Sequence, residues 1–130
     1  MFERYSEKAR RVIFFARYEA SNCGSPYIDT EHLLLGLLRE NRALVARFAQ
    51  TSTRELRNNI EKHIARAKPL KPSDQLPLTN QTKHVLALAA DSADKAGDRK
   101  VTPRHLLLGI LRLEECGAAK ILLKKESATS

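Results

Sequence analysis

Two stretches of the chain have nearly the same sequence, and they decide the fold. Residues 30–40 read TEHLLLGLLRE, and residues 103–113 read PRHLLLGILRL. In a helical conformation each stretch is apolar on almost every side, so each must be buried among other helices. We therefore expect two central helices, one in each half of the chain.

The similarity extends well beyond these two stretches. Residues 5–40 align with residues 78–113 at a constant offset of 73 positions and without a gap. The matched apolar positions step by three and four residues, which indicates helices. Because β-branched residues are few and no useful stretch alternates between apolar and polar, we predict an all-α fold with two copies of one helical unit.

Local signals place the ends of the helices in both copies. Ser6 and Thr79 are the predicted N-caps of the first helices. Gly24 and Gly97 are predicted to end those helices in the left-handed conformation. The second helices are predicted to start at Thr30 in the first copy and at Thr102 in the second. Pro103 fits the first helical position there, because it has no N–H to leave unpaired.

Two more helices are expected in the first half, around Arg42–Ala49 and after the capping box Ser52–Glu55. Only one is expected in the second half, near residues 117–125, because a copy of the fourth helix would fall at about 125–140, past residue 130. The pattern describes one domain over residues 1–130, a pseudo-twofold bundle whose second repeat lacks most of its last helix. Its parts are a first repeat at about 2–67, a proline-rich linker at 68–78, a second repeat at about 79–125 and a tail at 126–130.

The composition is that of a small basic globular domain. The 130 residues are 42% hydrophobic and 29% charged, and 23 Lys and Arg against 15 Asp and Glu give a net charge of +8. No apolar run approaches the roughly 18 residues of a membrane helix, and no secretory signal is visible. Cys23 and Cys116 are too far apart in sequence for a metal or redox pair. We expect a cytoplasmic protein with no membrane partner, metal or other cofactor.

The repeated TEHLLLGLL phrase, together with the opening FERYSEKA of residues 2–9, resembles the Clp N-terminal repeat domain. This domain precedes the ATPase modules of ClpC-, ClpA- and ClpB-type unfoldases, and the resemblance covers residues 2 to about 124. It implies a helical bundle that receives adaptors and substrates for a protease machine. Because no GxxxxGKS or GxxxxGKT motif occurs, we expect a non-enzymatic protein-interaction module that does not hydrolyse nucleotide.

Two versions of this interpretation stay open: an N-domain cut from a longer unfoldase, and a freestanding repeat protein, which the polar tail favours. A freestanding chain would leave apolar surface around Ile121, Leu122 and Leu123, and a homodimer is one way to cover it. The expected partners are Clp adaptors, substrate proteins, or Clp unfoldase and protease subunits.

Some ClpC-type members recognise phosphorylated arginine, and the resemblance implies where this ligand would bind. Glu31 beside Thr30 would hold the guanidinium, while Arg4 and Ser6 at the start of the first helix would face the phosphoryl group. The second copy has Arg104 at the carboxylate position, so we predict that its pocket is lost for this ligand. The alternative for Glu31 is a structural carboxylate that the helix dipole stabilises.

No catalytic residue is predicted. His32 and His105 occupy the same place on the two buried helices, and we interpret both as core histidines. Phe14 and Tyr18 lie off the apolar face of the first helix and are predicted to form an exposed patch for an adaptor or a second copy. The basic residues are spread over several helices, and we interpret most of them as solvated. Because helices rich in arginine can also contact phosphate groups, a basic helical nucleic-acid-binding protein is the alternative function.

Overall fold

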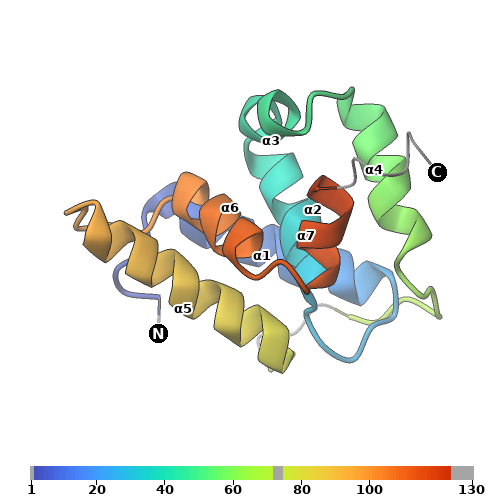
Figure 1. Ribbon diagram of the computed structural model, residues 1–130. Coiled ribbons are helices and arrows are strands. Elements are labelled where there is room, and N and C mark those ends of the chain that lie inside the picture. The colour runs from blue at the N-terminus through green and yellow to red at the C-terminus, as the bar shows by residue number, and fades with distance from the viewer. Residues whose placement is uncertain (1, 72–74, 124–130) are drawn as a thin grey trace.

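The computed structural model describes residues 2–71 and 75–123, which form seven α-helices and no strand (Figure 1). The predicted all-α fold is confirmed. The predicted lack of a fourth helix in the second repeat and the tail at 126–130 concern positions outside the described residues. The helices are α1 Glu7–Asn22, α2 Thr30–Glu40, α3 Arg42–Ala49, α4 Thr53–Lys62, α5 Asn80–Lys95, α6 Pro103–Arg112 and α7 Gly117–Leu122.

The first helix of each copy has the predicted N-cap at its start and the predicted glycine just after its end. Ser6 Oγ and Thr79 Oγ1 accept first-turn backbone N–H groups at 3.0 and 3.1 Å. Gly24 and Gly97 follow the helices with φ of 75° and 76°, a conformation that glycine adopts without strain. The two copies therefore begin and end their first helices in the same way.

A glycine lies at the crossing of each helix pair, α1 with α2 and α5 with α6. A Cβ atom on Gly36 would lie 2.5 Å from the carbonyl oxygen of Val12, and one on Gly109 would lie 2.5 Å from that of Val85. Such separations are too short for a carbon atom. The glycine of the LLLG phrase therefore lets the two backbones touch.

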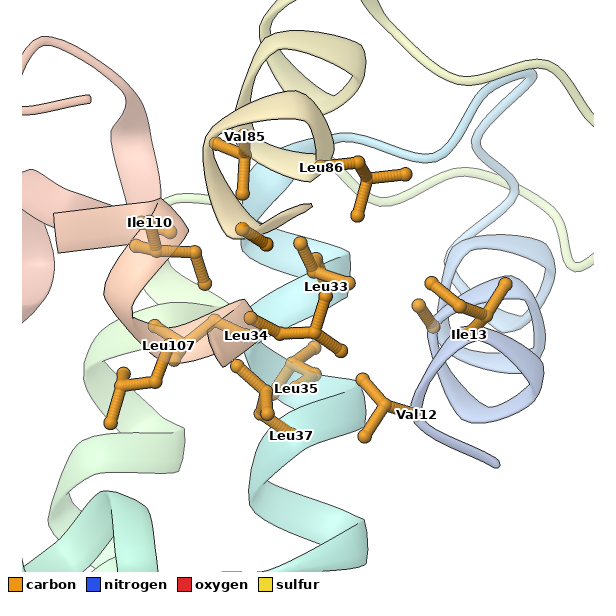
Figure 2. Packing of buried hydrophobic residues seen from close by; sticks show 14 of the residues in the cluster. Val12, Ile13, Leu33, Leu34, Leu35, Leu37, Val85, Leu86, Leu107 and Ile110 are labelled. Carbon is orange, nitrogen blue, oxygen red and sulfur yellow. The ribbon is translucent and has the colours of Figure 1, made fainter. Parts of the chain in front are cut away.

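Both helix pairs contribute to one core (Figure 2). Leu33 and Leu34 of α2 lie among side chains from α1, α5 and α6, and both are 0% exposed. Val12, Val85 and Ile110 are equally buried. Because the second helix of each copy supplies this shared core, it is apolar on nearly every side.

The two copies are also joined at their edges by backbone pairing. Tyr5 pairs with Val101 and Ile28 pairs with Leu78, in both cases as isolated parallel bridges. In each bridge the residue ahead of one copy's first helix meets the residue ahead of the other copy's second helix. The start of α1 is thereby held beside the start of α6, and the start of α5 beside the start of α2.

A buried carboxylate that the sequence analysis did not single out connects three helices. Glu19 of α1 is 3% exposed and accepts hydrogen bonds from Arg39 of α2 at 3.2 Å and from Arg57 of α4 at 3.0 Å. Two arginines offset the desolvation of one buried charge. The cluster holds α4 against the first helix pair.

The prediction of exposed apolar surface around Ile121 was wrong. Ile121 is 7% exposed and belongs to the core, and Leu122 and Leu123 are half-buried against it. The reason is that α7 packs against α2, α4 and α6. The large exposed apolar side chains nearby belong instead to α3 and α6, namely Phe48 at 42% and Leu108 at 40%.

We expect Gly36→Ala and Gly109→Ala each to lower the free energy of unfolding by about 1–3 kcal/mol, because an added methyl group must push two helices apart. Urea denaturation followed by circular dichroism measures this loss. Gly97→Asn is the control, since no atom lies within 4 Å of a Cβ there and asparagine tolerates a positive φ. Wild-type stability in both alanine variants would contradict the close helix contact.

Candidate functional site

The start of α2, the loop before it and the segment after α4 enclose a pocket of about 350 Å³. Gly24, Ser25, Pro26 and Tyr27 line one side of it, and residues 63–67 line another. Asp29, Glu31 and His32 line it from the first turn of α2. Glu31 is the one member of the predicted site that borders this pocket.

Glu31 is a half-buried carboxylate that lacks a cation. Within residues 2–71 and 75–123 no Lys or Arg forms an ion pair with it, and its Oε1 accepts a hydrogen bond from the Thr30 hydroxyl at 3.3 Å. Burial raises the pKa of Glu31, and the negative charge of Asp29 raises it further. A guanidinium or ammonium group entering the pocket would relieve this deficit of positive charge.

Thr30 and Glu31 also support the start of α7. The Thr30 hydroxyl accepts the Ala118 N–H at 3.3 Å, and the Glu31 carboxylate lies against Gly117, where any Cβ would clash with it. Thr30 is fully buried. Part of the role of this pair is therefore structural, through its contacts with α7.

The other two predicted site residues, Arg4 and Ser6, contact the second copy and not the start of α2. Arg4 forms an ion pair with Asp94 at 2.8 Å, and the Ser6 N–H donates to the Val101 carbonyl at 2.9 Å. Arg4 and Ser6 therefore contact Asp94 and Val101, whereas Thr30 and Glu31 contact the start of α7. The four predicted site residues are thus divided into two pairs with different neighbours.

The two core histidines are confirmed as buried, and they show how the copies differ. The Nδ1 atoms of His32 and His105 accept the N–H groups of Asp29 and Thr102, each at 2.9 Å. In a neutral ring Nε2 then carries the proton. Nε2 of His105 bonds to Asp98 Oδ2 at 2.8 Å, which satisfies that donor.

The first copy has no such acceptor. Ser25 stands at the position of Asp98, and its hydroxyl donates to the Tyr27 carbonyl at 2.6 Å. Among the described residues Nε2 of His32 has no hydrogen-bond partner, and the residue is 4% exposed. Burial lowers the pKa of His32. The aligned copies contain this Ser-for-Asp difference, so the sequence held a signal that motif reasoning missed.

The charges also differ at the second residue of α2 and of α6. Arg104 stands in place of Glu31 and is exposed. Among the described residues, the first copy therefore combines a carboxylate that has no Lys or Arg partner with a buried donor that has no acceptor, whereas the second copy has a satisfied histidine and an arginine without an ion pair. The starts of α2 and α6 therefore carry different charges.

The basic residues are less scattered than the sequence analysis expected. Four arginines line a groove of about 400 Å³ together with Phe15, Leu38 and Thr53; they are Arg39, Arg42, Arg54 and Arg57. The fold gathers them because α2, α3 and α4 converge there. Phe14 and Tyr18 are 59% and 41% exposed, as predicted, although the Arg39 guanidinium lies 5.2 Å from the Tyr18 ring centroid.

Three further features concern the part of the chain that the structure describes, residues 2–71 and 75–123. Cys23 and Cys116 are buried free thiols. No group of three His, Cys, Asp or Glu side chains is placed to hold a metal ion. No helix there is long and apolar enough to cross a membrane.

Comparison with known proteins gives a consistent result. The model of the Clp repeat (R) N-terminal domain family matches residues 4–125. Two similar proteins are the chloroplastic ATP-dependent Clp protease ATP-binding subunit ClpA homolog of Brassica napus and the chloroplastic chaperone ClpC1 of Oryza sativa subsp. japonica. Each is 36% identical over 125 residues, covering 94% of this chain and 14% of the relative.

Solved structures agree with the sequence relatives. The N-terminal domain of ClpD from Arabidopsis thaliana superposes with a TM-score of 0.78 at 27% identity, covering 98% of this chain and 89% of that one. The Hsp104 N-terminal domain of Candida albicans has a TM-score of 0.76 at 19% identity, covering 96% and 83%, and shows the shared fold.

Restoring the missing acceptor tests the difference between the copies. We expect Ser25→Asp to stabilise the chain by about 1 kcal/mol, because the new carboxylate accepts the proton of His32 Nε2. It also raises the pKa of His32. Because burial lowers the pKa of His32 in wild type, the gain is largest below that lowered value and shrinks as pH rises through the higher value of the variant. Asp98→Ser is the matched control and should lose stability. Thermal unfolding between pH 5 and pH 8 measures both; equal curves for all three proteins would contradict the assignment.

The raised pKa of Glu31 predicts a second pH effect. Because the unfolded chain releases this proton at a lower pH than the folded one, wild type loses stability as pH rises from about 4.3 through the folded-state value. Glu31→Gln removes the titration. The unfolding free energy of the variant, relative to wild type, should therefore increase between pH 4 and pH 7. A constant difference over that range would show that burial of Glu31 carries no penalty.

Proposed function

The chain belongs to the Clp repeat N-terminal domain family, and on that premise we propose that it is a non-catalytic protein-interaction module that docks adaptors or substrate proteins of a Clp system. The chain spans about 14% of the length of the curated relatives it matches, which are named as ATP-binding subunits and chaperones. Docking to a Clp ATPase or its protease is therefore a proposal for this chain. So is its cytoplasmic location, since those relatives are chloroplastic.

The observation that carries the proposal is Glu31 at the edge of the 350 Å³ pocket. A half-buried carboxylate without a cationic partner among the described residues is costly to a fold and useful to a binding site. Basic groups of a docked polypeptide supply the missing charge. The pocket is open enough for a side chain to enter and is lined by backbone and polar groups that can orient it.

A phosphorylated arginine is the ligand we propose for this pocket. Its guanidinium would pair with Glu31, and its phosphoryl oxygens would accept hydrogen bonds from Arg66 and from Nε2 of His32, both of which border the same space. Arg4 and Ser6 are proposed as anion contacts beside the start of α6, where Arg104 replaces Glu31. An arginine-type ligand is expected at the first copy alone.

Calorimetric titration with free phosphoarginine tests this proposal. Wild type should bind it, and Glu31→Ala should weaken binding by about tenfold or more, as expected for loss of a charge-assisted pair. Glu7→Ala is the matched control, because Glu7 is an exposed first-turn glutamate of α1. It should bind as wild type does. Absent binding, or equal binding by wild type and Glu31→Ala, would refute the site.

The groove of four arginines is the observation that favours the alternative of nucleic-acid binding. Arg39 and Arg57 are engaged by the buried Glu19, which leaves Arg42 and Arg54 for phosphate groups. Two free arginines give a small electrostatic footprint, so we favour a protein partner. Retention on duplex DNA that falls steeply with salt would instead support the alternative.

A further inference from the structure

The groove of about 400 Å³ that four arginines line lies where α1, α2, α3 and α4 meet. Phe15 and Leu38 contribute apolar atoms to its lining, and Thr53 contributes a hydroxyl group. The lining residues that the structure describes include no Asp or Glu. All four helices of the first copy take part, so this groove is not the seat of a missing repeat helix. We call it the arginine groove.

The buried Glu19 fixes two of the four guanidinium groups in place. Arg39 Nη1 and Arg57 Nη2 donate to Glu19 Oε2 at 3.2 and 3.0 Å. The Arg39 guanidinium also lies 4.9 Å from the centre of the Phe15 ring. Both arginine side chains stay partly exposed, at 41% and 35%, so the N–H groups that Glu19 does not use can reach a ligand. Guanidinium groups held in this way lose little conformational entropy when an anion binds.

Arg42 and Arg54 supply positive charge that the described part of the fold does not neutralise. Both side chains are exposed, and neither forms an ion pair with another described residue. Like charges that share one groove repel each other, and a bound anion removes this cost. The arginine groove therefore favours a ligand with several negative charges.

The second copy neutralises the equivalent arginine within the chain. Arg112 aligns with Arg39, and it pairs with the exposed Asp91 at 3.0 Å. In the first copy Tyr18 replaces that aspartate, and its ring centroid lies 5.2 Å from the Arg39 guanidinium. An exposed aromatic ring thus stands where the second copy has a carboxylate, which leaves the cations of the first copy to an external anion.

Aromatic side chains of α1 extend the arginine groove with an apolar strip. Phe14 and Tyr18 lie one helical turn apart and are 59% and 41% exposed, and the ring centroids of Phe14 and Phe15 are 5.8 Å apart. A ligand that carries only charge would leave these rings in water, whereas apolar side chains of a peptide would cover them. The Arg39 guanidinium already covers one face of the Phe15 and Tyr18 rings, which disfavours stacking of nucleobases there.

We propose that the arginine groove and the aromatic strip bind an acidic segment of a partner protein, in which Asp or Glu residues flank apolar side chains. The carboxylates pair with the four arginines, and the apolar side chains cover Phe14 and Tyr18. A second copy of this chain is the poorer occupant, because two chains of net charge +8 repel each other. The proposal rests on the role of the chain as an interaction module, but it concerns a surface other than the Glu31 pocket. Titrations with phosphoarginine and with an acidic peptide can therefore fail independently.

Designed peptides test the arginine groove directly. The probe is a fluorescently labelled peptide that carries a pair of leucines between two blocks of glutamates. One comparison peptide has lysine in place of every glutamate, and another has serine in place of each leucine. Fluorescence anisotropy with the full chain should show that the probe binds, that the lysine peptide does not, and that the serine peptide binds about tenfold more weakly.

Two double variants of the chain locate the contact. Arg42→Glu/Arg54→Glu should weaken binding of the probe by about tenfold or more, and it leaves the Glu19 cluster intact. Lys83→Glu/Lys100→Glu is the matched control, because it makes the same change in net charge at exposed lysines of the second copy. It should bind the probe within about twofold of wild type.

Several results would overturn the proposal. They are absence of probe binding, equal losses in the two double variants, equal affinity for the leucine and serine peptides, and self-association of the chain that Arg42→Glu/Arg54→Glu abolishes. Tighter binding of single-stranded DNA than of the probe at equal charge would also overturn it, in favour of the nucleic-acid alternative.

Discussion

Direct contact between helix backbones, at Gly36 and at Gly109, is the constraint on which the rest of the structure depends. It sets the spacing of α1 from α2 and of α5 from α6, and so fixes two nearly identical helix pairs. Each pair buries its leucine-rich second helix against the other pair. In the first turns of α2 and α6, Glu31 is half-buried and Arg104 is exposed, whereas Thr30, His32 and His105 are buried. The candidate pocket exists because one of those first turns carries Glu31 and His32.

The two copies keep one frame and present different surfaces on it. Leucines, capping hydroxyls and left-handed glycines are repeated, and these maintain the core. Two differences change the polar groups at the starts of α2 and α6: Ser25 against Asp98, and Glu31 against Arg104. Among the described residues, only the first copy combines a carboxylate that has no Lys or Arg partner with a buried histidine donor that has no acceptor.

Much of the fold could be predicted from the sequence, because helix periodicity, caps and the internal repeat are local or self-comparing signals. The buried Glu19 could not, since its partners Arg39 and Arg57 come from helices that meet only after folding. The same holds for Ile121, whose burial depends on where α7 packs. Within the candidate site, Glu31 was named because the chain resembles the Clp N-terminal repeat domain, and no local pattern points to it. Its separation from Arg4 and Ser6 arises from the exchange of contacts between copies, which no single-copy pattern contains.

The central claim is that an arginine-type ligand binds beside the start of α2 in the first copy and does not bind at the start of α6 in the second. The most direct measurement is an amide NMR spectrum of the isotope-labelled chain during titration with a short peptide that contains phosphoarginine. The account predicts shifts concentrated at residues 29–32 and 63–67, with residues 102–105 unchanged. Shifts centred on residues 102–105, or shifts of equal size at residues 29–32 and 102–105, would contradict it.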